Sequence, residues 1–228
     1  MMSKRVLYTS GEDFPFWDLT SPRLKEYAER HDAELIHLPK RTGDTPWWVL
    51  FDAFKASLEI EGEFDAAWID ADIIVGRHAR SIWQYGRFMV CEPHTPQRVH
   101  PKWARAVSNG KWGVPNKRPY PVTAVVSWSS NQRMLISELS EWFESGVEKK
   151  RFPGSGSKRR WWGDQEVLAL AIWELNIPTH FFPSKLHSMK AKKEKCEMAH
   201  AAGSGKMRRL RNFEKLMSRW ERQAQKAD

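Results

Sequence analysis

The sequence predicts a single α/β domain with a mainly parallel sheet flanked by helices, followed by a basic C-terminal helix. Short apolar runs rich in β-branched residues alternate with segments whose apolar residues recur at helical spacing, which is typical of such a sheet. A length of 228 residues suits one domain with a sizeable core. Because no linker divides the chain convincingly, we expect one domain over residues 1–205 and a helix over residues 206–228 that packs on it.

The first expected element is a strand over residues 5–9, RVLYT. A helix is expected to begin at Ser21 and Pro22, because serine is a favoured N-cap residue and proline suits the first helical position. The run ELIHL over residues 34–38 predicts the second strand. Strand, helix and strand in this order indicate the beginning of a parallel sheet.

The same N-cap signal at Thr45 and Pro46 predicts a second helix, which we expect to end at Gly62. Lys55 is the one cation of this otherwise apolar helix. Later patterns predict strands over residues 64–75, 87–91 and 122–128 and helices that begin at Ser130, at Asp164 and at Lys206.

The strand over residues 64–75, FDAAWIDADIIV, contains the strongest candidate for a functional site. In an extended chain the side chains of residues i and i+2 share a face, so Asp70 and Asp72 can converge on one cation. Carboxylate oxygens suit Mg²⁺ or Mn²⁺, and such an ion commonly bridges to substrate phosphates. Two solvated aspartates at the end of a strand are the simpler interpretation, but the apolar residues on both sides favour a metal site.

The charge of the chain is uneven. The formal net charge is +9, yet residues 1–145 hold 18 basic and 19 acidic residues, whereas residues 146–228 hold 19 basic and 9 acidic residues. We therefore expect a polyanionic partner to contact the C-terminal third. Cys91 and Cys196 form no CxxC pair, no apolar run is long enough to span a bilayer, and the N-terminus has no signal-peptide pattern. These features predict a cytoplasmic protein without a zinc or disulfide motif.

Four features occur in a fixed order along the chain. The first is a strand that ends in Tyr8, Thr9 and Ser10, and the second is a helix with Lys55 followed by the strand that ends in Asp70 and Asp72. The third is the pair Asp164 and Gln165, which follows Gly163. The fourth is an H-x-x-G-x-x-K spacing at His200, Gly203 and Lys206. This order resembles that of the GT-A glycosyltransferases, which are single Rossmann-like α/β domains with a mixed sheet. It is most similar to the retaining family-eight type of glycogenin and the bacterial lipopolysaccharide galactosyltransferases. The resemblance covers residues 6–206.

The resemblance implies that a sugar is transferred with retention from a nucleotide sugar, with a UDP-sugar as the expected donor, to an acceptor hydroxyl. It implies that Asp70, Asp72 and His200 hold Mn²⁺ or Mg²⁺ and that Asp164 and Gln165 act at the donor sugar. The implied donor-binding residues are Tyr8, Thr9, Ser10, Lys55, Gly203 and Lys206.

The chain departs from the family pattern at two places. Many relatives carry an N-x-G where this chain has Val122, Thr123 and Ala124, and Lys206 is followed by Met207 where relatives commonly have Pro-Trp. Glycosyl transfer requires cations at the site, because a nucleoside diphosphate leaves readily only when its growing negative charge is neutralised. No single residue has the pattern of a nucleophile, which is consistent with a diphosphate that helps to deprotonate the acceptor as it departs.

The acceptor is expected to be anionic. Nucleic acid ranks first, for example DNA with hydroxylated bases, before an anionic glycan or a membrane surface. The basic residues of the last third exceed what one diphosphate needs, and two adjacent tryptophans there can stack on an exposed base. The candidate acceptor residues are Lys158, Arg159, Arg160, Trp161 and Trp162. The alternative is a non-catalytic basic protein that binds nucleic acid through the same region. Asp70 and Asp72 favour the enzyme, because a pure polyanion binder has no use for two carboxylates in a cleft.

Overall fold

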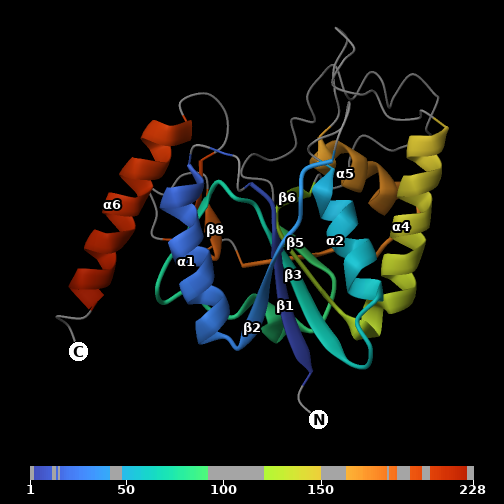
Figure 1. Ribbon diagram of the computed structural model, residues 1–228, viewed down its shortest axis with the longest axis horizontal. Helices are drawn as coiled ribbons and strands as arrows, with labels where there is room; N and C mark the ends of the chain where they lie inside the picture. Colours follow the sequence, from blue (N-terminus) through green and yellow to red (C-terminus); the bar gives the residue numbers. More distant parts are fainter. Residues whose placement is uncertain are drawn as a thin grey trace, which may run out of the picture.

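A computed structural model of the chain describes residues 3–11, 14, 16–41, 48–91, 121–149, 163–183, 185–188, 196–201 and 206–224. These residues form a six-stranded sheet with helices on both faces and a smaller, three-stranded sheet beside it (Figure 1). The α/β class, the mixed and mainly parallel sheet and the flanking helices that the sequence predicts are confirmed.

The six-stranded sheet consists of β1 Lys4–Thr9, β2 Ala33–His37, β3 Phe64–Ile69, β5 Met89–Cys91, β6 Val122–Ser129 and β7 His180–Phe181. Their spatial order is β2-β1-β3-β6-β5-β7. The pairs β1–β2, β1–β3 and β5–β7 are parallel, and β3–β6 and β5–β6 are antiparallel. The register sets Tyr8 beside Trp68 and Ile69 opposite Val125, so β1 and β3 end at the same edge of the sheet.

One face of this sheet is covered by α2 (Val49–Leu58), α4 (Arg133–Glu148) and α5 (Asp164–Glu174) (Figure 1). Apolar side chains of these helices and of alternate strand positions form the largest core cluster of the described residues. The helices α2 and α4 meet through the stacked rings of Phe51 and Phe143, whose centroids are 4.0 Å apart. Residues 167–173 of α5 are all apolar and all buried, which is typical of a helix that is covered on more than one side.

The opposite face is covered by α1 (Trp17–Arg30). The buried face of this helix includes Leu24 and Tyr27. The prediction that the helix begins at Ser21 and Pro22 is wrong, because it begins four residues earlier and both residues lie within it. Proline at this position gives up one helical hydrogen bond. Packing of the first turn into a third core cluster compensates that loss.

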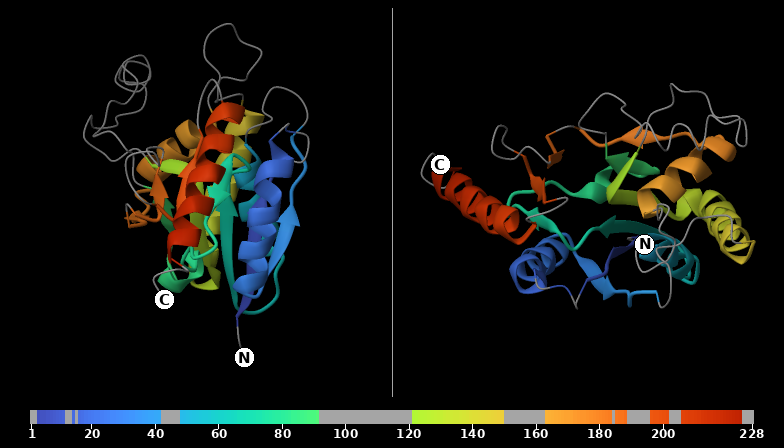
Figure 2. Two further views of the ribbon diagram at one scale, coloured as in Figure 1. Left: turned by 90° about the vertical axis from the view of Figure 1, so that its left-hand side faces the viewer. Right: turned by 90° about the horizontal axis from the view of Figure 1, so that it is seen from above.

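The smaller sheet consists of β4 (Ile73–Val75), β9 (Met198–His200) and β8 (His187–Ser188) in the order β4-β9-β8. The predicted terminal helix is present as α6 (Lys206–Ala224). It packs on β4 and α1 and forms one edge of the molecule (Figures 1 and 2). A domain boundary at residue 205 stays a prediction.

Three local expectations are corrected. Residues 64–75 form two strands in different sheets, β3 and β4, because β9 provides β4 with its own antiparallel partner. The helix expected from Ser130 begins as a 3-10 turn over Ser130–Gln132 and continues as α4 from Arg133. Ser129, and not Ser130, caps this turn, and its amide and hydroxyl both donate to Gln132 Oε1. Helix α2 ends before Gly62, which has a φ of +75° in the turn that leads to β3.

The remaining expectations concern single elements. The predicted strands over residues 5–9, 34–38, 87–91 and 122–128 are confirmed as β1, β2, β5 and β6, within two residues at each end. The N-cap signal at Thr45 and Pro46 lies outside the described residues. No described helix combines the length and the apolar character that a bilayer-spanning segment needs.

Candidate active site

A tight turn carries the two predicted carboxylates from the end of β3 to the start of β4. The amide of Asp70 donates to the carbonyl of Ala124 at 3.0 Å, and the amide of Ile73 donates to the carbonyl of Asp70 at 3.2 Å. The turn packs against Gly11 in the segment that follows β1. A Cβ on Gly11 would lie 2.4 Å from the Cβ of Ala71, and the φ of +143° at Gly11 also disfavours any other residue. Neighbouring strands therefore hold the turn from both sides.

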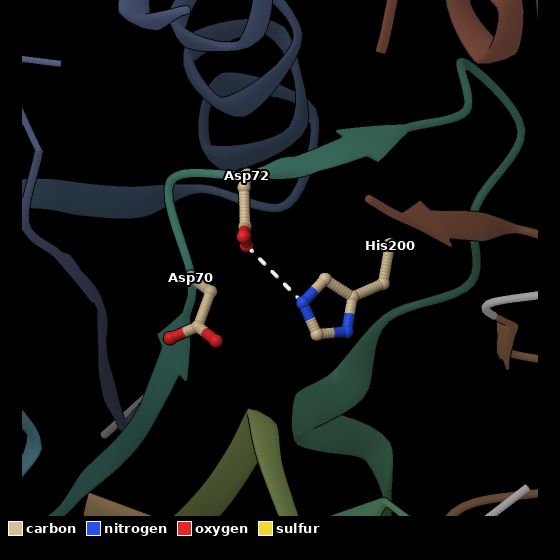
Figure 3. Close-up of side chains that lie close together, drawn as sticks. All are labelled: Asp70, Asp72 and His200. Atoms are coloured by element: carbon tan, nitrogen blue, oxygen red, sulfur yellow. Dashed lines mark ion pairs between the residues drawn. The ribbon is translucent and has the colours of Figure 1, made fainter. Parts of the chain in front are cut away.

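Asp70, Asp72 and His200 come together at this turn (Figure 3). Each offers one ligating atom, and these atoms lie within 4.8 Å of one another. His200 is placed by β9, which sets it opposite Ile73 of β4, and its Nε2 lies 3.3 Å from Asp72 Oδ1. The expectation of a shared face on an extended chain is wrong, since residues 70–72 form a turn. The turn nevertheless brings both carboxylates to the imidazole.

The site concentrates negative charge where water is scarce. Asp72 and His200 are 7% and 9% exposed. Burial, followed by repulsion from Asp164 and Asp72, raises the pKa of Asp70 well above its ordinary range, although His200 acts in the opposite direction. Carboxylates that are crowded and poorly solvated either take up protons or need a cation nearby.

Hydrogen-bond donors orient two of these carboxylates. Trp68 Nε1–H donates to Asp70 Oδ1 at 2.7 Å. Asp164 stands at the first position of α5, where it accepts from the side chain of Thr123 and, at 2.9 Å, from the amide of Gln165. Burial raises the pKa of Asp164, and these two hydrogen bonds act against that rise. The donors therefore favour the charged forms that a metal ion or a sugar hydroxyl would meet.

The donor set fits a divalent metal ion. Carboxylate oxygens suit Mg²⁺ and Mn²⁺, and a neutral imidazole nitrogen is a common metal ligand. A cation among Asp70, Asp72 and Asp164 would offset their mutual repulsion and remove the need for protonation. Asp70, Asp72 and His200 could hold such an ion directly.

The carboxylates border a pocket of about 130 Å³, well above the space that one water molecule needs. Its other walls include Ser10, Phe14, Phe16 and Lys40. The Nζ of Lys40 lies 4.0 Å from the centroid of the Phe14 ring, which holds the ammonium group by a cation–π contact. The pocket therefore combines acidic groups with a fixed cation, which suits a ligand that carries both a metal ion and phosphates.

The other predicted site residues have different environments. Tyr8 and Thr9 are buried in the sheet, so Ser10 is the residue at the end of β1 that lines the pocket. Lys55 is exposed on α2 and, within the described part of the chain, does not line the pocket. Gln165 is half-buried beside Asp164. Outside the described residues lie Lys158, Arg159, Arg160, Trp161, Trp162 and Gly203, together with the side chain of Lys206.

Besides apolar wall residues such as Phe14 and Phe16, three residues that bring a charge or a hydrogen-bond donor to the site have no role in the sequence prediction: Lys40, Trp68 and Thr123. Trp68 belongs to an apolar run and is 4% exposed, so its sequence context indicates core; its position two residues before Asp70 is the available signal. Thr123 lies near the start of β6, and its hydroxyl donates to the carboxylate of Asp164. Lys40 follows β2, and the carboxyl end of a parallel strand is a usual place for ligand-binding residues.

Comparison with protein-family models and with curated proteins finds no match. Among solved structures, the fold is similar to that of a glycosyltransferase involved in the glycosylation of the major capsid of PBCV-1. The TM-score is 0.58 at 10% identity, over 94% of this chain and 99% of the other. It is also similar to mouse xyloside xylosyltransferase 1 in its apo form, with a TM-score of 0.52 at 12% identity, over 90% of this chain and 98% of the other.

A third similar structure is the apo-form glycosyltransferase GlyE of Streptococcus pneumoniae TIGR4. Its TM-score is 0.52 at 10% identity, and the match covers 98% of this chain and 64% of the other. At such low identity these likenesses show the fold alone. The chain therefore has a glycosyltransferase fold, and the family-eight type stays a prediction.

Proposed function

We propose that this chain is a metal-dependent glycosyltransferase that uses a nucleotide sugar, with a UDP-sugar as the first candidate donor. The observation that carries the proposal is the convergence of Asp70, Asp72 and His200 at the carboxyl end of β3, inside a glycosyltransferase fold. Ligands of α/β sheets bind at this end of the strands. The donor chemistry needs positive charge at the same place.

Different residues at the site bind different parts of the donor. When bound to Asp70, Asp72 and His200, Mn²⁺ or Mg²⁺ supplies the positive charge that stabilises a departing diphosphate. Lys40, held against Phe14 at the pocket wall, faces the same anion. Ser10, at the exit of β1, offers a hydroxyl to the nucleoside.

The connection from β9 to α6 is proposed to bind the diphosphate of the donor. His200 ends β9 and Lys206 begins α6, so the H-x-x-G-x-x-K spacing spans this connection. The N-terminus of a helix carries a partial positive charge and free amide groups, which favour an anion. Gly203 allows close approach of the backbone to phosphate oxygens, and the Lys206 ammonium adds a full charge.

Asp164 and Gln165 are assigned to the donor sugar. Asp164 lines the pocket, and its hydrogen bonds from Thr123 and the Gln165 amide keep its carboxylate oriented. The acceptor hydroxyl forms the new bond to the anomeric carbon on the face from which the diphosphate leaves. Its proton passes to a diphosphate oxygen as the bond from that oxygen to the anomeric carbon breaks. The configuration is retained because the new bond forms on the same face of the sugar as the bond that breaks.

The acceptor is assigned to an anionic molecule, with nucleic acid first, because the basic excess lies in the C-terminal third. Lys158, Arg159 and Arg160 would contact its phosphates, and Trp161 and Trp162 would stack on a base. A protein acceptor is the second candidate, since one structural neighbour is involved in the glycosylation of a viral capsid. Non-catalytic nucleic-acid binding is the second candidate function.

A thermal-shift measurement with nucleoside diphosphates, each with and without Mn²⁺, tests the donor site. A ligand at one hundred times its Kd stabilises the native state by about 2.7 kcal/mol. For a chain of this size each kcal/mol raises the Tm by about 2–4 °C, so we expect a shift of about 5–11 °C with UDP and Mn²⁺ together.

Two aspartate variants make this measurement specific. Asp72→Asn removes a proposed metal ligand with little change in size and should abolish the shift. Asp65→Asn is the matched control, because Asp65 lies on β3, before the turn that carries Asp72, and accepts a hydrogen bond from the Ser3 hydroxyl away from the pocket. An equal shift without Mn²⁺, or a full shift in Asp72→Asn, would remove the metal from the proposal. No shift with any nucleotide would favour the non-catalytic alternative.

A further inference from the structure

Helix α6 presents a second charged surface, on the side that faces away from the rest of the molecule. Its inner side is buried through Leu210, Phe213 and Met217, which belong to the cluster that also includes residues of β4 and β9. Figures 1 and 2 show α6 as the outermost element at one edge, beside α1. The outer side of the helix is therefore open along its length.

Basic residues form one continuous line on that outer side. They follow one another at intervals of three or four residues, so they share one face of the helix. All of them are exposed: Arg208, Arg211, Lys215, Arg219 and Arg222. The line spans about 21 Å, at about 1.5 Å per residue. We name these five residues the α6 basic ridge.

No acidic residue of α6 compensates the ridge. The acids of this helix are Glu214 and Glu221, and both turn toward Arg23 of α1, at 3.7 Å and 2.6 Å. Among the described residues, no ridge member forms an ion pair. Like charges at helical spacing weaken a helix, and solubility is served as well by mixed charges, so the arrangement points to a partner.

We propose that the α6 basic ridge binds the phosphate backbone of a nucleic acid without reading its bases. Four of its five members are arginines, whose planar guanidinium groups bind phosphate oxygens through two parallel hydrogen bonds. A ridge one helix wide and about 21 Å long is complementary to a rod of regularly spaced charges. Duplex DNA places about 12 phosphates along that length.

A flat anionic membrane is less complementary to this surface. Helix α1 lies beside α6, and its exposed and half-exposed charges are mixed. The acids Asp18, Glu26 and Glu29 stand among the bases Lys25 and Arg30, so α1 does not extend the basic surface over the broad plane that a lipid surface would contact. The apolar face of α6 is already occupied by the protein core, so it cannot enter the acyl region as an interfacial helix does. A polyanion that follows the ridge alone avoids both obstacles.

The test is an anisotropy titration of labelled duplex DNA with the protein alone, without metal or nucleotide, at several salt concentrations. Its outcome is therefore independent of the proposed glycosyl transfer. Five phosphate contacts at the ridge contribute about −4.5 to the slope of log Ka against log salt, which corresponds to about 500-fold weaker binding at about 200 mM than at about 50 mM salt. The triple variant Arg211→Gln, Lys215→Gln and Arg219→Gln loses three phosphate contacts, so its slope should be less negative by about 2.7. The loss of affinity between the two salt concentrations should then be smaller than in the wild type by a factor of about 40.

A matched triple variant controls for net charge. Arg5→Gln, Arg87→Gln and Lys149→Gln remove the same charge from exposed positions outside α6 and should leave the slope unchanged. Equal thermal midpoints show that both triples fold. An unchanged slope in the ridge triple, or an equal change in both triples, overturns the proposal. Binding of the wild type to phosphatidylserine vesicles but not to duplex DNA also overturns it and assigns the ridge to a membrane.

Discussion

The substitution Trp68→Phe isolates one hydrogen bond at the centre of the site. The indole Nε1–H donates to Asp70 Oδ1 at 2.7 Å. Burial raises the pKa of Asp70, and this hydrogen bond acts against that rise because it favours the charged form. Phenylalanine keeps an aromatic ring at this position but has no N–H. Because a carboxylate must be ionised to bind a cation, loss of this donor should weaken Mn²⁺ binding.

The expected magnitude follows from the strength of this bond. A hydrogen bond to a charged acceptor contributes about 1.5–3 kcal/mol, which corresponds to a factor of about 10 to 150 in an equilibrium constant. Partners that orient metal ligands typically change metal affinity by about 10- to 100-fold. We therefore expect the Kd for Mn²⁺ to rise about 10- to 100-fold in Trp68→Phe, measured by paramagnetic resonance of the free ion with UDP present.

Trp128→Phe is the matched control. Trp128 is 1% exposed, and its Nε1–H donates to Ser57 Oγ at 2.9 Å, away from the pocket. This variant should lose stability in the same way as any buried indole but keep wild-type Mn²⁺ affinity. Unchanged affinity in a folded Trp68→Phe, or an equal loss of affinity in both variants, would refute the positioning role of Trp68.

Other contacts lead to predictions of their own. Glu221→Gln should lower the free energy of unfolding by about 3 kcal/mol at neutral pH. Arg23 stays buried, the Ser218 hydroxyl at 3.0 Å is neutral, and the carboxylate of Glu214 lies 3.7 Å away. Burial acts to raise the pKa of Glu221, but the hydrogen bonds from Arg23 and the Arg77 amide outweigh it and hold that pKa below its ordinary value. This stabilisation is therefore present above about pH 4.3 and lost as the pH falls further, so urea unfolding of the two proteins should converge in acid. Gly11→Ala should destabilise by about 1–3 kcal/mol and weaken Mn²⁺ binding, since its Cβ would meet that of Ala71 at 2.4 Å. Gly86→Ala is the control, because Gly86 has a φ of +57° and open space around it. This variant should lose stability but keep its Mn²⁺ affinity. An equal effect of Gly11→Ala and Gly86→Ala on Mn²⁺ binding would show that contact with Gly11 does not position the turn. Transfer should retain the anomeric configuration of the donor, and an inverted product by proton resonance would exclude the retaining branch.

Local patterns are sufficient to predict most of the described strands and helices. Each element buries one face, so its apolar residues must recur with the period of its backbone, and this period is visible in sequence. Asp70, Asp72 and His200 can also be chosen from sequence, because short spacings and their order along the chain carry that information. The structure brings the three side chains together.

Features that depend on tertiary packing could not be predicted in the same way. The early start of α1 depends on contacts of Phe16 and Trp17 with distant residues of the third cluster. The turn at residues 70–72 depends on β9, which is far away in sequence and pairs with β4. The pocket role of Lys40 likewise requires the sheet to place the end of β2 near that of β3. None of these contacts leaves a local periodic signal.

We propose that Asp70, Asp72 and His200 hold a divalent ion against the diphosphate of the donor. A crystal structure with Mn²⁺ and UDP tests this arrangement, because the anomalous signal of manganese locates the ion independently of the protein atoms. We expect one peak among the three side chains, with an imidazole nitrogen of His200 about 2.0–2.3 Å away and diphosphate oxygens completing the coordination. A peak elsewhere, or a His200 imidazole turned away from the ion, would contradict the claim.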